Sequence, residues 1–190
     1  MLGIAPTGSG KTLAYVLPAA VHMLARREDA SAALKQDKKN TSAQSKKQRR
    51  EAERRIGCLP YVLVLVPTRE LAQQVASACR PLQTQHGLRS VAVYGGKDNK
   101  EKQVDDLTDG AQLVVGTPGR LLDLRKIGAL LLQRVSMLVL DEADRMLAMG
   151  FEAQLDAIGL MLRPDRQTLL FSATFAAKLS KLNPPIPPKP

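Results

Sequence analysis

Residues 2–12 read Leu-Gly-Ile-Ala-Pro-Thr-Gly-Ser-Gly-Lys-Thr, a short apolar run followed by a glycine-containing loop and the start of a helical segment. The glycines let backbone N–H groups turn toward phosphate oxygens, and the following helix directs its positive end to the same place. Lys11 reaches the terminal phosphates, and the Thr12 hydroxyl is a ligand for Mg²⁺. A Gly-rich turn that merely precedes a helix is the weaker alternative, because strand, loop, Lys-Thr and helix occur in the required order. The predicted nucleotide-binding residues are Ala5, Thr7, Gly8, Ser9, Gly10, Lys11 and Thr12.

Apolar runs rich in Val, Ile and Leu recur along the chain, and helix-like segments follow most of them. Two of the runs have almost no polar residues, which is typical of strands buried on both faces of a parallel sheet. The predicted fold class is therefore α/β, a phosphate-loop domain with a mostly parallel sheet and helices on both faces. The predicted strands are Leu2–Ala5, Tyr61–Val66, Val91–Tyr94, Leu113–Gly116, Val135–Leu140 and Thr168–Phe171. The predicted helices are Lys11–Leu24 with a kink at Pro18, Arg69–Arg80, Asp98–Leu107, Pro118–Lys126 and Glu142–Leu162.

The length of the chain, 190 residues with 44% hydrophobic content, corresponds to one domain. No apolar run approaches the roughly 18 residues that a membrane-spanning helix needs. We expect the domain at residues 1–182, with a basic low-complexity insertion at 28–55 and a Pro-rich tail at 183–190. Cys58 and Cys79 lack the spacing of a disulfide framework or a zinc site. An intracellular protein of the nucleus, nucleolus or cytoplasm is the expectation.

The net charge of +10 favours a polyanionic partner. Residues 26–55 hold eleven Lys or Arg and five Asp or Glu, so most of the excess lies in one segment. Aromatic residues make up only 3% of the chain, which argues against a surface that stacks successive bases. Nucleic acid would be held mainly by its backbone. The insertion itself is either a solvated loop or an auxiliary RNA-binding or nuclear-import segment.

An acidic group, Asp141-Glu142-Ala143-Asp144, follows the apolar run at 135–140. A nucleotide hydrolase needs one carboxylate to hold Mg²⁺ and a neighbour to orient or deprotonate the attacking water. Asp141 is predicted to hold Mg²⁺, and Glu142 to orient or deprotonate the attacking water. Read alone, the group is also consistent with an acidic helix start that the helix dipole favours.

Together these motifs make the chain resemble the DEAD-box ATP-dependent RNA helicases, specifically their first RecA-like domain. The resemblance extends from Leu2 to about Ser180, apart from the insertion, and each motif follows a predicted strand in the family's order. Besides Ala5–Thr12 and Asp141–Asp144, it is carried by Pro67-Thr68-Arg69-Glu70-Leu71-Ala72, Gly95-Gly96, Thr117-Pro118-Gly119-Arg120 and Ser172-Ala173-Thr174.

The resemblance implies that the chain binds ATP with Mg²⁺ and the backbone of single-stranded RNA, and that it couples ATP hydrolysis to duplex unwinding. The catalytic residues it implies are Lys11, Asp141 and Glu142. The RNA-binding residues it implies are Pro67, Thr68, Arg69, Glu70, Gly95, Gly96, Thr117, Pro118, Gly119 and Arg120. The residues it implies for coupling hydrolysis to strand separation are Asp144, Ser172, Ala173 and Thr174.

The residue types suit these roles. Arginines offer charged donors to phosphates, glycines allow close backbone approach, and Thr68 and Thr117 are suited to cap helices aimed at phosphates. Read alone, each motif also has a plainer interpretation: a simple turn at Gly95-Gly96, a helix entry at Pro118-Gly119, and a polar strand end at Ser172.

The chain also departs from the family's pattern. Ala5 replaces the first loop glycine, and Pro6 stands where the family often has Gln; both are expected to be tolerated. The family's adenine-recognition segment would lie before residue 1, and its second RecA-like domain, with the arginine fingers, would follow Thr174. A truncated nucleotide- and RNA-binding fragment without turnover is therefore the alternative to an active helicase. A small nucleotide kinase is less favoured, because no acceptor lid is found and Thr117–Arg120 would have no role.

Overall fold

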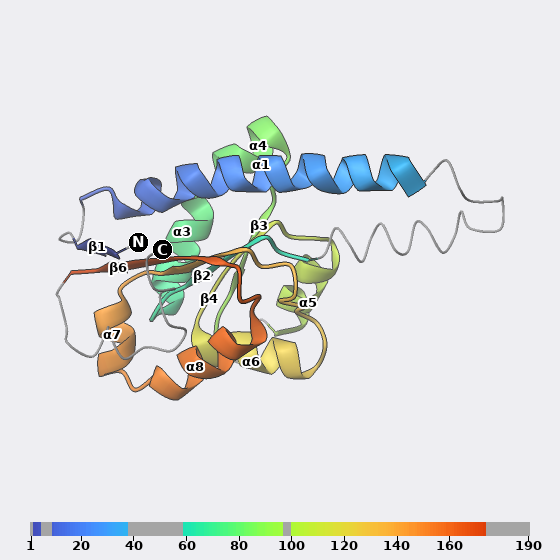
Figure 1. Cartoon of the computed structure of the whole chain (residues 1–190). Helices are drawn as coiled ribbons and strands as arrows, with labels where there is room; N and C mark the ends of the chain where they lie inside the picture. The colour runs from blue at the N-terminus through green and yellow to red at the C-terminus, as the bar shows by residue number, and fades with distance from the viewer. Residues whose placement is uncertain (1, 5–8, 38–58, 97–99, 174–190) are drawn as a thin grey trace.

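The computed structural model describes residues 2–4, 9–37, 59–96 and 100–173. Six strands form one sheet in the order β1-β6-β5-β2-β4-β3, and every neighbouring pair runs parallel (Figure 1). The α/β prediction is therefore confirmed. The strand bounds differ from the predicted ones by no more than two residues. The strands are β1 (Leu2–Ile4), β2 (Val62–Leu65), β3 (Ser90–Val93), β4 (Leu113–Gly116), β5 (Met137–Leu140) and β6 (Gln167–Ser172).

The central strands are buried on both faces, as their unbroken apolar sequence predicts. In β2, Leu63 and Leu65 belong to the apolar cluster on one face of the sheet, and Val62 and Val64 to the cluster on the other. The first face is covered by α5 (Lys100–Thr108), α6 (Pro118–Lys126), α7 (Ala143–Ala148) and α8 (Glu152–Met161). The opposite face is covered by α1 (Lys11–Asp37), α3 (Arg69–Ala78) and α4 (Arg80–His86).

Helix α1 runs along its face of the sheet and is longer than predicted (Figure 1). Tyr15, Ala19 and Met23, spaced one helical turn apart, are buried against the sheet. The helix does not end at Leu24 but continues to Asp37, so the first part of the predicted insertion is helical. Ala, Arg, Glu and Lys favour the helical conformation, and extending an existing helix costs far less than nucleating one. The rest of the insertion, from residue 38, and the Pro-rich tail lie outside the described residues.

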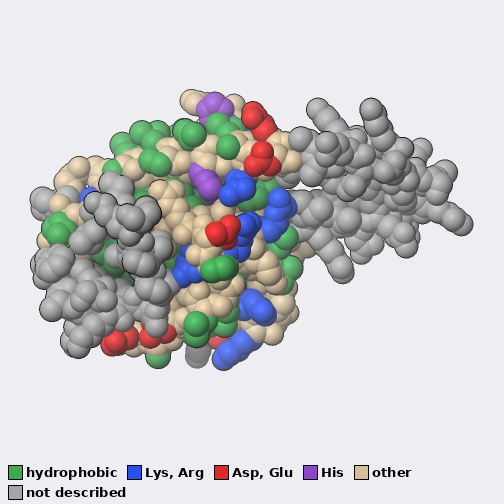
Figure 2. All heavy atoms as spheres, viewed as in Figure 1, with side chains coloured by type: hydrophobic (Ala, Val, Ile, Leu, Met, Phe, Trp, Pro, Cys, Tyr) green, Lys and Arg blue, Asp and Glu red, His purple; other side chains and the backbone are tan. Residues whose placement is uncertain are grey.

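The outer side of α1 carries an apolar stripe. Leu13, Leu17 and Val21 are 55%, 59% and 69% exposed. Hydrophobic side chains accordingly gather along the helix at the top of the molecule (Figure 2). Pro18 lies inside the helix and does not end it.

One predicted helix is divided in the structure and another ends early, so those two predictions were wrong in extent. The segment predicted as Glu142–Leu162 contains α7 and α8, separated at Gly150, whose φ of 80° is unfavourable for other residues. The segment predicted as Arg69–Arg80 ends as α3 at Ala78, and α4 then begins with Pro81 in its first turn. Proline lacks the backbone N–H that is unpaired in a first turn anyway, so Pro81 is well suited to the start of α4. Helix α6 has the predicted bounds.

Candidate nucleotide and nucleic-acid site

The order of the strands brings the nucleotide-related motifs together. β1, β6 and β5 are neighbours, with Ile4 paired to Ser172 and Leu140 paired to Leu170. The carboxyl ends of parallel strands meet at one edge of the sheet, where ligands of such folds bind. Ile4, Ser172 and Leu140 therefore end three adjacent strands; in the sequence the phosphate loop follows Ile4, and Asp141 follows Leu140.

The other half of the sheet brings together the motifs predicted to contact RNA. β2, β4 and β3 are neighbours, and Leu65 and Val93 both pair with Gly116. The segments that follow these strands begin at Val66, Thr117 and Tyr94. One edge of the sheet thus carries both predicted sites side by side.

Asp141 is the buried centre of the nucleotide half, with 3% of its surface exposed. Its N–H donates to the carbonyl of Leu65 at 2.9 Å. Its Oδ2 accepts a hydrogen bond of 2.8 Å from the hydroxyl of Tyr15, and its Oδ1 accepts one of 3.0 Å from the N–H of Glu142. The carboxylate is therefore fixed in orientation from two directions.

Tyr15 connects this carboxylate to the phosphate-loop helix. It follows Lys11 by one helical turn, and its hydroxyl also interacts with the side chain of Thr12. Burial, then the charge of Asp141 beside it, raises the pKa of Tyr15 far above its ordinary value, so Tyr15 remains a hydrogen-bond donor. Thr12 and Asp141 are brought to the same place by contact with one phenol.

Burial also raises the pKa of the Asp141 carboxyl above its ordinary value. The hydrogen bonds from Tyr15 and from the Glu142 backbone, and the positive charge of Lys11, oppose that effect. A desolvated carboxylate near a lysine, with lone pairs remaining on both oxygens, is suited to bind a cation.

The donor set fits Mg²⁺ bound together with a nucleotide. Among the described residues no group of three or more His, Cys, Asp or Glu is arranged to hold a metal ion by itself. Mg²⁺ is commonly held by one or two carboxylates plus substrate phosphates, with several waters retained. Asp141 and Thr12 provide a carboxylate and a hydroxyl of the kind such a site uses. Of the other phosphate-loop residues, Ser9 and Gly10 are described, whereas Ala5, Thr7 and Gly8 lie outside the described residues.

Glu142 has a strained backbone. Its φ of 52° is the only positive value for a non-glycine residue in the described parts of the chain. Its Oε2 accepts a hydrogen bond of 3.1 Å from Arg145, and its side chain is 20% exposed. Strain of this kind is kept where the surrounding structure demands it, often at functional sites. Here it turns the chain sharply between β5 and α7 and leaves the Glu142 carboxylate beside Asp141.

On the RNA half, side chains from α3 and α5 hold Tyr94. The guanidinium of Arg69 lies 6.0 Å from the centre of the Tyr94 ring, and Gln73 donates to its hydroxyl at 2.8 Å. The side-chain amide of Gln103 accepts from the Tyr94 N–H at 3.3 Å and donates to its carbonyl at 3.1 Å. Tyr94 is thereby fixed directly before the predicted contact residues Gly95 and Gly96.

Arg120 is oriented into this cluster rather than outward. Only 9% of its surface is exposed. It donates to Gln103 Oε1 at 3.2 Å and to the carbonyl of Gly96 at 2.8 Å. Arg120 therefore holds the Gly95-Gly96 segment, whereas Arg69 is exposed and ion-paired at 3.6 Å with Glu70.

The capping predictions had mixed outcomes. The hydroxyl of Thr68 accepts a hydrogen bond of 3.3 Å from the N–H of Leu71 and caps α3 as predicted. Thr117 precedes α6 but makes no side-chain cap bond, so that prediction was wrong. Its own N–H donates to Val93 at 3.1 Å, so its orientation is set by the sheet. Pro118 is buried behind it, and Gly119 is exposed.

The residues predicted to couple hydrolysis to strand separation are only partly described. Ser172 is fully buried at the end of β6, and Ala173 after it is exposed. Asp144 accepts a hydrogen bond of 3.0 Å from the N–H of Arg145 in the first turn of α7. Thr174 lies outside the described residues.

Sequence reasoning missed Tyr15, Tyr94 and Gln103. Tyr15 had one detectable signal, its position a helical turn after Lys11 on the buried side of an amphipathic helix. Tyr94 directly precedes a glycine pair at a strand end. Gln103 carries no local signal, because its partners, Tyr94 and Arg120, belong to two other segments of the chain.

A protein-family model described as DEAD/DEAH box helicase matches residues 1–182. The chain belongs to this family. It is 46% identical over 182 residues to the mouse ATP-dependent RNA helicase DDX42, covering 96% of the chain and 17% of that relative. It is 44% identical over the same length to the ATP-dependent RNA helicase DBP2 of Saccharomyces cerevisiae, covering 29% of that protein. The chain thus spans less than a third of the length of these helicases.

Solved structures of the helicase family share the fold. The yeast DEAD-box splicing factor Prp28 superposes with a TM-score of 0.75 at 30% identity, over 98% of this chain and 39% of that one. A DEAD-box protein from Methanococcus jannaschii gives a TM-score of 0.72 at 32% identity, over 97% of this chain and 42% of that one. The predicted family and its RecA-like fold are confirmed. No helix in the described part of the helicase domain is long and apolar enough to cross a membrane.

Proposed function

We propose that the chain is the nucleotide-binding part of an ATP-dependent RNA helicase that binds ATP with Mg²⁺ and the backbone of single-stranded RNA. The observation that carries the proposal is the arrangement of one sheet edge. The phosphate-loop helix and Asp141 follow β1 and β5, and the Arg69, Gly96 and Arg120 segments follow β2, β3 and β4. Nucleotide and RNA would therefore occupy adjacent positions on one rigid element.

In the nucleotide half, each residue has a role that its position supports. Lys11 and the N–H groups that begin α1 face the phosphates. Asp141 and Thr12 hold Mg²⁺, and Tyr15 fixes the orientation of Asp141 through its 2.8 Å hydrogen bond. Glu142, next to Asp141, orients the attacking water or takes its proton. Bound ATP with Mg²⁺ supplies the phosphoanhydride bond whose hydrolysis drives the cycle.

In the RNA half, exposed residues are proposed to contact the strand, and buried residues to position them. Arg69 offers an exposed guanidinium to a phosphate, and the backbone of Gly95, Gly96 and Gly119 allows close approach of the strand. Arg120 fixes the glycine segment from inside. Ser172, at the end of β6, and Asp144, in the first turn of α7, are the proposed route by which the two halves influence each other.

Unwinding requires more than this domain in the family that the chain belongs to, where a second RecA-like domain supplies arginine fingers. Such fingers increase turnover in phosphate-loop enzymes by about 10³ to 10⁵. Neither the family match nor the names of the relatives favours the alternative of a binding fragment without turnover.

The proposed function is tested in two steps. Titration calorimetry with Mg-ATP compares the chain with Lys11→Ala and with Lys126→Ala, an exposed lysine on α6. We expect Lys11→Ala to lose nucleotide binding and Lys126→Ala to keep it; equal affinities for all three would contradict the proposal.

Turnover is then measured with single-stranded RNA and the second RecA-like domain of DBP2 added in trans. We expect RNA-stimulated hydrolysis that Glu142→Gln abolishes without loss of Mg-ATP binding. Hydrolysis that persists in Glu142→Gln would remove that residue from the proposed chemistry.

A further inference from the structure

The outer edge of β3 is an unpaired strand edge within the described structure. β3 is the last strand of the sheet and pairs only with β4. The carbonyl of Arg89 accepts from Leu113 at 3.2 Å, and that of Val93 accepts from Thr117 at 3.1 Å. In a parallel ladder alternate residues face the same neighbour, so Ser90 and Ala92 direct their N–H and C=O groups away from β4.

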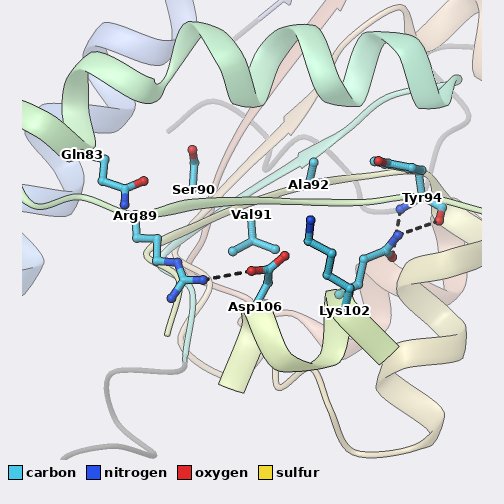
Figure 3. A pocket seen from close by; sticks show the side chains of 9 residues that line it. Gln83, Arg89, Ser90, Val91, Ala92, Tyr94, Lys102 and Asp106 are labelled. Carbon is cyan, nitrogen blue, oxygen red and sulfur yellow. Dashed lines mark hydrogen bonds and ion pairs between the residues drawn. The ribbon is translucent and has the colours of Figure 1, made fainter. Parts of the chain in front are cut away.

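This edge lies in a hollow between helices. Two cavities of about 430 and 440 Å³ lie along it and share three lining residues, Gln83, Ser90 and Ala92. The first extends toward α5, and the second toward α3 and the start of α4. Figure 3 shows β3 running between α5 below and a helix above, with the side chains of Ser90 and Ala92 on one side of the strand and Val91 on the other. β3 is short, but the outward N–H and C=O groups of an edge strand are a template with which another strand can pair.

One position of the edge is already paired by an amide. Gln103, with 4% of its surface exposed, accepts from the Tyr94 N–H and donates to the Tyr94 carbonyl through its side chain. This is the pair of hydrogen bonds that a peptide group of an added strand would make. Tyr94 is the next outward-facing residue after Ala92, so the same edge offers two more such positions, at Ala92 and Ser90.

The charges around the hollow favour an acidic occupant. Arg89 is neutralised by Asp106 at 3.2 Å and by Asp109 at 3.4 Å. Lys102, on α5, and Arg80, at the start of α4, also line the cavities and are exposed. Neither forms an ion pair with another residue in the described ranges, and Figure 3 shows Lys102 directed toward the strand. An exposed cation therefore stands on each side of the open edge.

We propose that the outer edge of β3 binds an extended acidic segment of a partner protein, which adds to the sheet beside β3. Backbone hydrogen bonds to Ser90 and Ala92 would fix the register of the added strand relative to β3. The pockets on either side would select its side chains. Because side chains of a strand alternate between faces, two adjacent acidic residues would meet Arg80 on one side and Lys102 on the other. The inference does not depend on the proposed nucleotide or RNA sites.

The probe is a fluorescent peptide with the sequence Thr-Val-Asp-Glu-Val-Thr-Val, titrated against the whole chain by fluorescence anisotropy. One control peptide has Lys in place of both acids. A second is N-methylated at alternate residues, which removes the N–H groups of one edge while leaving its charge unchanged. We expect saturable binding of the acidic peptide, with loss of binding for both controls.

Variants of the protein separate strand addition from simple charge attraction. Arg80→Glu and Lys102→Glu should each weaken binding by about fivefold, since each reverses one exposed charge contact. Ala92→Pro removes an outward N–H without touching the ladder to β4 and should abolish binding. Lys126→Glu, an equal charge reversal on α6 outside both cavities, should leave the affinity unchanged; circular dichroism verifies the folding of each variant.

Amide hydrogen exchange gives the direct readout. Bound peptide should slow exchange at Ser90 and Ala92 and not at residues of β1, the other edge of the sheet. Absence of saturable binding, equal binding of the N-methylated peptide, or equal weakening by Lys126→Glu would overturn the proposal. Displacement of the peptide by single-stranded RNA with the same dependence on Arg80 and Lys102 would also overturn it, in favour of a polyanion site.

Discussion

The hydroxyl of Tyr15 donates a hydrogen bond of 2.8 Å to Oδ2 of Asp141, 126 residues further along the chain. Both residues are buried; Tyr15 lies on the helix that follows the phosphate loop, and Asp141 begins the acidic motif. The bond therefore joins the phosphate-loop helix to the acidic segment after β5. It also gives Oδ2 of this buried carboxylate a neutral donor, while Oδ1 accepts from the N–H of Glu142.

Replacing Tyr15 by Phe should lower the free energy of unfolding by about 2 kcal/mol at neutral pH, because a buried carboxylate loses a hydrogen bond. Chemical denaturation measures the change. Tyr94→Phe is the matched control, since its hydroxyl bond to Gln73 is exposed and its loss should change stability by no more than about 0.5 kcal/mol. Equal small effects in both variants would show that Asp141 does not depend on Tyr15.

His22 should make stability depend on pH. Its Nε2 lies 2.7 Å from the Ser136 hydroxyl, and burial, together with the charge of Arg26, lowers its pKa below the ordinary 6.5. The unfolded chain then binds a proton more readily than the native protein, so the stability contributed by neutral His22 is present above pH 6.5 and is lost as the pH falls toward the lowered pKa.

The measurement is the urea midpoint of the chain and of His22→Gln between about pH 8 and pH 5. We expect the native protein to lose more stability than the variant on acidification. His86→Gln, at an exposed position, serves as the control and should follow the native curve. Parallel curves for the native chain and His22→Gln would mean that the burial of His22 has no consequence for titration.

The strands and the order of the motifs could be predicted because their signals are local. An unbroken apolar run such as 135–140 specifies a buried strand, and Gly10-Lys11-Thr12 specifies a loop and a helix start. The division between α7 and α8 was not predicted. The apolar periodicity of residues 142–162 indicates one long helix, and a single glycine, Gly150, is not enough to predict a break.

The side-chain arrangement of the site could not be predicted from local patterns. Tyr15 meets Asp141 only because α1 packs across a sheet in which β5 is central. Thr117 directly precedes α6 and its N–H donates to Val93, but its side chain makes no cap bond, which its sequence pattern did not indicate. Arg120 looked like an exposed phosphate ligand because nothing in its own segment indicates Gln103 or the Gly96 carbonyl.

The basic segment that follows α1 gives a prediction about RNA affinity. If it contacts RNA, each phosphate contact adds about −0.7 to the slope of log affinity against log salt for single strands. Since α1 extends to Asp37, the deletion should begin at residue 38 and end at residue 55, so that the helix is left intact. We expect a shallower slope in the deletion variant; an unchanged slope would identify the segment as a solvated loop.

The two arginines of the RNA half should respond differently to substitution by Ala. Arg69 is exposed, so Arg69→Ala should leave stability within about 0.5 kcal/mol and reduce the salt slope of RNA binding by about 0.7, one phosphate contact. Arg120 is buried, and Arg120→Ala removes the side-chain donor to the Gly96 carbonyl and one of the two donors to Gln103 Oε1. That loss should lower the free energy of unfolding by about 1 to 3 kcal/mol.

Denaturation and RNA titration at several salt concentrations, performed on both variants, distinguish the two roles. Arg120→Lys is the informative third variant, because it keeps the charge but cannot reach two acceptors with the planar geometry of a guanidinium. If Arg120 acts by holding the Gly95-Gly96 segment, Arg120→Lys should resemble Arg120→Ala in stability and weaken RNA binding with little change in the salt slope. A stable Arg120→Ala whose salt slope falls as in Arg69→Ala would instead make Arg120 a direct phosphate ligand, released from Gly96 when RNA binds.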